Sequence, residues 1–240
     1  MFSLLQTANT GPVPINDVLF VVTPYVVLAL FFVATIWRYV KEKFSFSTYS
    51  SQFLENQHQF WGSVPFHYGV LALFAGHLIG FLFPRELLWW NSVPARLYII
   101  ELGALTFGVV TLVGLTNLII RRAIDPRVRA VTSKMDVVIL VLLLLQVIGG
   151  LWVALTARWG TSWFAAVLAP YLLSLFTFQP DASAVANLPW SIKLHILGAY
   201  LIFAVFPFTR LVHVLVVPNH YLWRRTQVVM WNRKATERVD

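Results

Sequence analysis

Five runs of mainly apolar residues constrain the fold of this chain more than any other feature. They cover residues 18–37, 66–83, 97–120, 137–157 and 192–217, and charged residues or prolines bound them. A helix needs about 20 such residues to cross the hydrocarbon core of a bilayer. The sequence therefore predicts an all-α fold, a bundle of five transmembrane helices that forms one membrane domain over residues 1–240.

The composition excludes an ordinary water-soluble protein. Of the 240 residues, 58% are hydrophobic and 12% are charged, whereas soluble domains have about 25% charged residues. A sixth apolar stretch, residues 163–178, is short for a span and contains Pro170, so we expect an interfacial or re-entrant segment before the fifth helix. The chain has no cysteine, so a redox function must use histidine ligands or a partner protein.

The net charge of +8 indicates the orientation of the chain rather than nucleic-acid binding. Fourteen of the 18 Lys and Arg residues lie on one side of the predicted membrane: Arg38, Lys41, Lys43, Arg121, Arg122, Arg127, Arg129, Lys134, Arg210, Arg224, Arg225, Arg233, Lys234 and Arg238. The other side holds Arg85, Arg96, Arg158 and Lys193. Because cytoplasmic loops are rich in Lys and Arg, we expect a multi-pass protein of the cell inner membrane. Its N-terminus would lie outside and its tail, residues 218–240, in the cytoplasm.

Four of the six histidines fall within predicted spans. His67 and His77 lie on the second span, and His195 and His213 lie on the fifth. Because these two helices run in opposite directions, we expect His67 level with His213 near the cytoplasmic face. His77 would then be level with His195 near the outer face. Eighteen residues complete five helical turns, so we expect His195 and His213 on one face of the fifth helix.

Two level pairs of histidines on facing helices favour two b-type haems. Ionisable side chains are costly in hydrocarbon and usually serve a function there, and a bis-histidine haem takes one neutral imidazole from each side of the iron. Glycines give space where a porphyrin could lie flat against a helix: Gly69, Gly76, Gly80 and Gly198. On the residues alone, a transporter with a proton path through the histidines is the alternative. His58 and His220 receive no role.

Motifs around these histidines carry a family resemblance over nearly the whole chain. They are Phe66-His67-Tyr68-Gly69, Ala75-Gly76-His77, Pro126-Arg127-Val128-Arg129-Ala130 and Phe206-Pro207-Phe208-Thr209-Arg210-Leu211-Val212-His213. In these motifs and in both histidine spacings, the sequence resembles the gamma subunit of respiratory nitrate reductase, the membrane cytochrome b of that enzyme. The resemblance implies that His67 and His213 ligate a proximal haem b on the cytoplasmic side, and that His77 and His195 ligate a distal haem b on the outer side.

The resemblance also implies a substrate and partners. Quinol would be oxidised near the outer face, and electrons would pass through both haems to an iron–sulfur subunit and a molybdenum catalytic subunit in the cytoplasm, contributing to the proton-motive force. Arg96 is the candidate for the quinol site, or else an interfacial anchor. Arg210, one turn before His213, is a candidate partner for a haem propionate, or else an ordinary cytoplasmic-side anchor.

Two alternatives to this function stay open at the level of the sequence. The chain could be the cytochrome b subunit of a related molybdoenzyme, such as nitrite oxidoreductase, since nothing in it contacts the terminal substrate. The second alternative is a non-redox, proton-coupled transporter. No nucleic-acid partner is expected, because the basic residues are explained by membrane topology.

Overall fold

The computed structural model describes residues 14–42, 45–46 and 57–216, so the predicted tail and His220 lie outside the described residues. The elements in chain order are α1 (Ile15–Asp17), the π-helical η1 (Val18–Val22), α2 (Thr23–Lys41), α3 (Gln57–Leu82), α4 (Pro84–Asn91), α5 (Pro94–Ile124), α6 (Pro126–Ala130), α7 (Lys134–Thr156), α8 (Gly160–Trp163), the π-helical η3 (Phe164–Leu168), α9 (Ala169–Phe176), α10 (Ser183–Ala186), α11 (Trp190–Val205) and the 3₁₀ segments η4 (Phe206–Phe208) and η5 (Arg210–Val216). Every one of these elements is helical, which confirms the predicted all-α class for the described part of the chain.

Five helices in the described part are long and apolar enough to cross a membrane, as predicted. They are Ile15–Lys41, Phe60–Leu82, Pro94–Ile124, Lys134–Thr156 and Trp190–Phe208. Large apolar side chains are exposed along all five, and Val33, Leu71, Ile99, Leu145 and Leu194 are each more than 60% exposed. Such surfaces suit a hydrocarbon solvent, and the chain is a multi-pass membrane protein.

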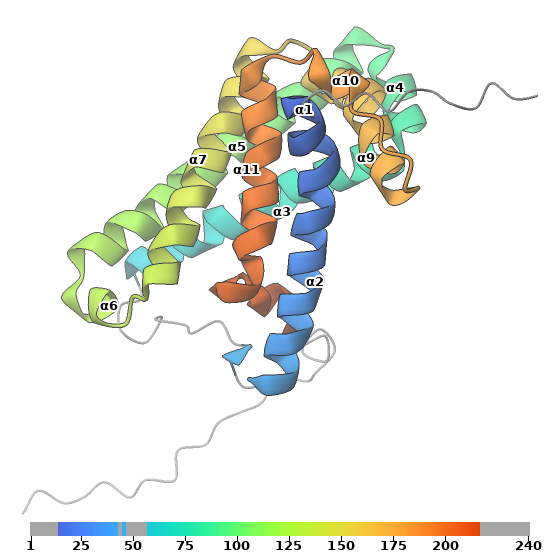
Figure 1. Ribbon diagram of the computed structural model, residues 1–240. Coiled ribbons are helices and arrows are strands. Elements are labelled where there is room, and N and C mark those ends of the chain that lie inside the picture. Colours follow the sequence, from blue (N-terminus) through green and yellow to red (C-terminus); the bar gives the residue numbers. More distant parts are fainter. Residues whose placement is uncertain (1–13, 43–44, 47–56, 217–240) are drawn as a thin grey trace, which may run out of the picture.

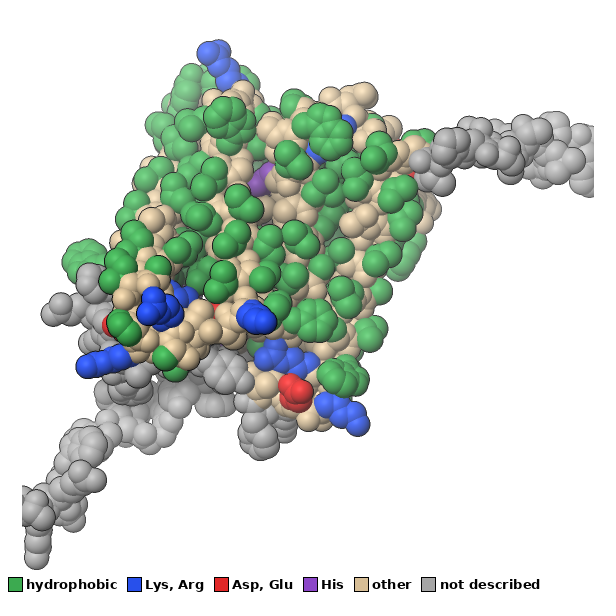
Figure 2. Space-filling model, turned by 60° about the vertical axis from the view of Figure 1, so that its left-hand side comes forward, with side chains coloured by type: hydrophobic (Ala, Val, Ile, Leu, Met, Phe, Trp, Pro, Cys, Tyr) green, Lys and Arg blue, Asp and Glu red, His purple; other side chains and the backbone are tan. Residues whose placement is uncertain are grey.

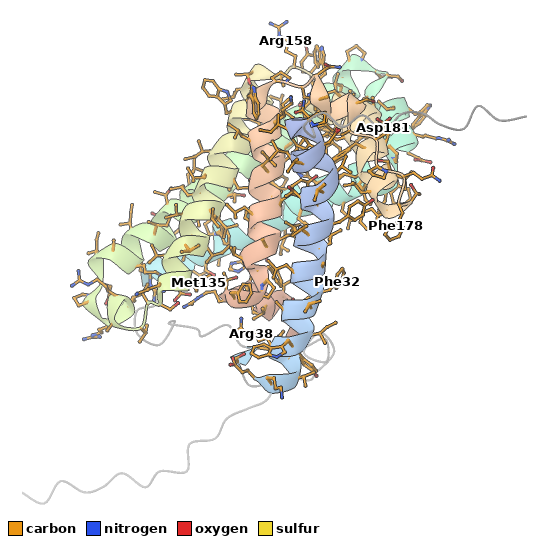
Figure 3. All side chains as sticks on the ribbon, in the orientation of Figure 1. Phe32, Arg38, Met135, Arg158, Phe178 and Asp181 are labelled. Carbon is orange, nitrogen blue, oxygen red and sulfur yellow. The ribbon has the colours of Figure 1, made fainter. Side chains whose placement is uncertain are left out.

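The five spans alternate in direction and define two ends of the bundle (Figure 1). The upper end of Figure 1 gathers α4, α9 and α10, and the lower end contains α6 and the end of α2. Arg158 and Asp181 lie at the upper end, and Arg38 and Met135 lie at the lower end (Figure 3). Apolar side chains cover the face between the ends, with most visible Lys and Arg side chains near the lower end (Figure 2).

The helices pack in a series in which α5 and α7 lie between the two histidine-bearing spans, α3 and α11. α5 packs against α3 and α7, α7 packs against α11, and α11 packs against α2. The contact between α3 and α5 is at backbone level: a Cβ at Gly69 would lie 2.9 Å from the Thr111 nitrogen, and one at Gly114 would lie 2.8 Å from the Gly62 oxygen. Glycines at these points let the two helices approach closely.

The upper end has a buried core of its own, made where η1 meets the segment before α11. Its members are Phe20, Leu168, Tyr171, Leu175, Ala182 and Val185. The Tyr171 hydroxyl donates to the Phe20 carbonyl oxygen at 2.7 Å and lies 2.8 Å from the Tyr200 hydroxyl. Burial, with the Tyr200 hydroxyl alongside, raises the pKa of Tyr171 above its ordinary value, so Tyr171 remains a donor. The apolar stretch before α11 is therefore a short helical segment at the upper end, consistent with the interfacial position we expect.

The fifth span differs from the prediction in one respect that affects the site. We expected one helix over residues 192–217, but the α-helix ends at Val205 and gives way to the 3₁₀ segments η4 and η5. Pro207 lacks an N–H, so it cannot continue the hydrogen-bond ladder, and Thr209 adopts an extended conformation (φ −113°, ψ 177°). His195 and His213 therefore lie on different elements, and the expectation that they share one helical face is wrong.

The lower end has a tight corner between α5 and α7. Asp125 caps α6 by accepting the N–H groups of Arg127 at 2.8 Å and Val128 at 3.2 Å. Ser133 and Asp136 then form a reciprocal capping box at the start of α7, with N···O distances of 3.1 and 2.9 Å. The capping box fixes the Asp136 carboxylate in a buried position, 4% exposed.

Candidate functional site

His67 and His213 lie close together at the lower end of the bundle. His67 lies on α3 and His213 on η5, and their ring centres are 6.3 Å apart with an angle of 69° between the rings. The two residues are 146 positions apart in the chain, so only the tertiary fold brings them together. The structure thus forms the lower of the two pairs that the sequence predicts.

Among the described residues, the same nitrogen, Nδ1, is hydrogen-bonded on both rings. Nδ1 of His67 lies 2.7 Å from the Ser63 carbonyl oxygen, and Nδ1 of His213 lies 2.6 Å from the Arg210 carbonyl oxygen. A carbonyl can only accept, so Nδ1 carries the proton and Nε2 has a lone pair. This is the orientation that metal-ligating histidines adopt, with the outer N–H bonded to a backbone carbonyl.

The spacing of this pair fits a metal ion held between the two rings. An imidazole nitrogen binds a metal at about 2.0 Å and the ring centre lies about 1.1 Å further away, so two imidazoles on opposite sides of one ion have centres about 6 Å apart. The observed 6.3 Å agrees with this value. Among the described residues no three His, Cys, Asp or Glu side chains gather around one point, which is compatible with an axial haem pair because that needs only two.

His77 on α3 and His195 on α11 lie toward the upper end. Nδ1 of His77 bonds the Leu73 carbonyl oxygen at 2.8 Å, and the His77 ring contacts the Phe164 ring edge to face at 5.4 Å. His195 packs instead against α7, where a Cβ added at Gly150 would lie 2.9 Å from its Cε1. Nδ1 of His195 is buried and has no hydrogen-bond partner among the described residues.

The glycines that we expected to make room for porphyrins have different roles. A Cβ at Gly76 would meet nothing within 4 Å, so this position on the second span is open, as a flat macrocycle requires. The expectation is wrong for Gly69, which packs on α5, for Gly80, whose Cβ would lie 3.0 Å from the Phe164 ring, and for Gly198, which packs on the Gln146 side chain. Helix packing and side-chain contacts use these three positions.

Arg210 forms an ion pair that the sequence analysis missed. Its guanidinium donates to both oxygens of Asp136, and Arg122 lies 3.5 Å from the same carboxylate. Because the Arg210 carbonyl also accepts the Nδ1 proton of His213, Asp136 anchors the segment that orients this histidine. The signal in the sequence was the spacing Ser133-x-x-Asp136, which is typical of a capping box.

Two further arginines, Arg38 and Arg96, contact other groups of the protein. Arg38 donates to the Pro207 and Thr209 carbonyl oxygens, the latter at 3.2 Å, and thereby caps the broken end of the fifth span. The guanidinium carbon of Arg96 lies 5.3 Å from the ring centres of both Trp89 and Trp90. Arg96, the quinol-site candidate, is thus a half-buried cation held against two indoles at the upper end.

A polar cluster at the upper end was also missed by the sequence analysis. Glu101 on α5 accepts hydrogen bonds from the backbone and hydroxyl of Thr161, both at 2.8 Å. The Asn91 amide donates to the hydroxyls of Thr161 and Ser162, each at 3.0 Å. These bonds attach α8 to α4 and α5, and they position the adjoining η3, whose Phe164 contacts His77.

Comparison with known proteins identifies relatives over most of the chain. The family model described as nitrate reductase gamma subunit matches residues 16–232. The nitrate reductase gamma chain of Bacillus subtilis (strain 168) is 33% identical over 212 residues, covering 87% of this chain and 95% of that protein. The respiratory nitrate reductase 2 gamma chain of Escherichia coli (strain K12) is 34% identical over 223 residues, covering 91% and 98%. The nitrate reductase-like protein NarX of Mycobacterium tuberculosis is 30% identical over 228 residues, covering 92% of this chain but 35% of that protein.

Proposed function

The chain belongs to the nitrate reductase gamma subunit family, and we propose that it serves as the dihaem cytochrome b that takes electrons from quinol for its complex. Membership makes it a membrane subunit of an oxidoreductase. The observation that best supports haem binding is the pair His67 and His213, with ring centres 6.3 Å apart and Nδ1 of both rings bonded to a backbone carbonyl. His77 and His195 form a second candidate pair, one membrane level away.

The histidines would hold one haem b at each level. When bound, each haem supplies a one-electron carrier within the bilayer. His67 and His213 would ligate the lower haem, and His77 and His195 the upper one. The carbonyls of Ser63, Leu73 and Arg210 keep Nδ1 protonated on three of these rings, which directs Nε2 to the metal.

Quinol would be oxidised at the upper end, where we propose Arg96 as a contact. Its guanidinium and the two indoles beside it form an amphipathic site at the membrane interface, where a quinol head group would lie. If Arg96 binds quinol, Arg96→Ala slows quinol oxidation while both haem spectra remain. An unchanged rate would exclude Arg96 from the quinol site.

The lower end would face the cytoplasm and dock the partner subunits. Most Lys and Arg side chains visible in Figure 2 gather there, as the positive-inside tendency requires. The chain has no cysteine for an iron–sulfur cluster, so such a centre would belong to a separate electron-transfer subunit, which would feed a molybdenum catalytic subunit. Protons from quinol would leave at the upper, outer face while electrons cross inward, which contributes to the proton-motive force.

The test is to express the chain with its complex in haem-replete cells and to reduce the purified protein with a soluble menadiol. We expect two b-type haems that quinol reduces. His67→Ala should remove one haem and His195→Ala the other. His58→Ala, a matched change on the same helix as His67, should keep both. A haem-free wild-type protein, or one whose haem content is the same in all three variants, would refute the proposal.

A further inference from the structure

Gln146 is a side-chain amide near the middle of α7, a helix of 23 residues. The nine residues on its N-terminal side, Val137–Leu145, are all apolar. An amide without hydrogen bonds is costly in hydrocarbon, so the partners of Gln146 reveal why it is there. In the structure, the Gln146 amide contacts a single residue of a neighbouring helix.

The Gln146 amide nitrogen makes two polar contacts within the described residues, and both are to His195 on α11. The amide donates to the His195 carbonyl oxygen at 3.0 Å and lies 3.4 Å from Nε2 of the same residue. His195 also differs from the other three histidines, because its Nδ1 has no partner in the described chain, whereas theirs bond carbonyls three or four residues earlier. Its own helix therefore does not orient the His195 ring.

Glycines on both helices make room for this contact. Gly149 and Gly150 lie against the His195 ring, and a Cβ at Gly150 would come within 2.9 Å of it. On α11, a Cβ at Gly198 would overlap the Oε1 atom of Gln146. Three glycines thus shape one contact between α7 and α11.

From these contacts we infer that Gln146 is a positioning residue for His195, which it holds across the helix interface through its hydrogen bond to the His195 carbonyl oxygen. The inference rests on the proposed function, since it assigns Gln146 to the ligand of the upper haem. Hydrogen bonding around a ligand changes its orientation and its donor strength, and both set the reduction potential of the metal. Gln146 should therefore affect the potential of the upper haem and leave the lower one unchanged.

Gly198 gives access to the same contact from the opposite helix. Gly198→Ala forces the flexible end of Gln146 to move, whereas in a Gln146→Ala background the new methyl group has space. The two substitutions should therefore not be additive. Gln146→Met keeps the volume of the side chain but removes its hydrogen bonds. This variant replaces Gln146→Ala in the experiment if Gln146→Ala fails to fold. Leu145→Ala is the matched control, since this neighbouring side chain is 61% exposed.

The experiment is a potentiometric titration of the haem absorption bands in the purified complex, with the upper haem identified as the one that His195→Ala removes. We expect Gln146→Ala, Gln146→Met and Gly198→Ala to shift the upper potential in one direction. The double variant should show the shift of Gln146→Ala alone, and Leu145→Ala none. Two haems with unchanged potentials in the Gln146 variants, equal shifts at both haems, or additive shifts would overturn the inference. A wild-type protein without two haems would overturn the proposed function as well, so the two failures are distinguishable.

Discussion

Replacing Asp136 by asparagine should destabilise the lower end of the bundle and disturb only the haem site at His213. Asp136 is 4% exposed and accepts from two arginines, Arg210 on η5 and Arg122 on α5. Removing one partner of a buried ion pair costs about 3–5 kcal/mol because the remaining charge is uncompensated. The arginine side chains are 23% and 15% exposed and can partly reach water, so we expect about 3 kcal/mol. The amide oxygen of an asparagine at position 136 can still accept the Ser133 N–H, so this cost measures the ion pair.

The assay is unfolding of the detergent-solubilised protein, followed by far-UV circular dichroism and by the absorbance of each haem. Asp125→Asn is the control, because Asp125 caps α6 and asparagine caps equally well. The double variant Asp136→Asn/Arg210→Gln should cost less than the sum of the single changes, with a coupling energy of about 2 kcal/mol. If Asp136→Asn were as mild as Asp125→Asn, or if both haems changed alike, the role given to this ion pair would be refuted.

Three further predictions concern helix packing, the broken span and orientation. Gly69→Ala should lower the free energy of unfolding by about 3 kcal/mol because α3 and α5 would have to separate. Gly76→Ala should leave polypeptide stability unchanged, because a Cβ at Gly76 meets nothing within 4 Å. Equal costs would contradict the packing described. Arg38→Ala should cost about 2 kcal/mol because it leaves the Pro207 and Thr209 carbonyl oxygens without this hydrogen-bond donor. Lysine should rescue the loss poorly because a single ammonium cannot replace the guanidinium fork, and full rescue would argue against the cap. Since the chain has no cysteine, Arg158→Cys should react with an impermeant thiol reagent in intact cells and Arg127→Cys only after permeabilisation, and the reverse result would invert the proposed orientation.

The sequence predicts the spans well because long apolar runs have few alternatives in a bilayer. It also predicts that His67 and His213 lie at one level, since connected spans alternate in direction. It misses the break after Val205, although Pro207 marks the place, because an apolar run continues through it. His213 still meets His67, but from a 3₁₀ segment and not from the helix that carries His195.

The supporting residues could not be predicted because they depend on which helices are neighbours. Asp136 and Gln146 act on histidine segments of the fifth span, and this requires α7 to pack beside α11. An apolar pattern does not specify that order, since side chains that face lipid and side chains that face a neighbouring helix are both largely apolar. Each residue has a local sequence signal: Asp136 belongs to a capping-box pattern, and Gln146 is a lone amide within an apolar helix. Neither signal indicates which residue of another helix it contacts.

The most direct test of the central claim is the haem content per chain of the purified protein, measured together with its optical redox titration. Two b-type haems with separate potentials, one lost in His67→Ala and in His213→Ala and the other lost in His77→Ala and in His195→Ala, are the result that the paired histidines predict. A protein that binds fewer than two haems, or in which His67→Ala and His213→Ala remove different haems, would contradict the assignment.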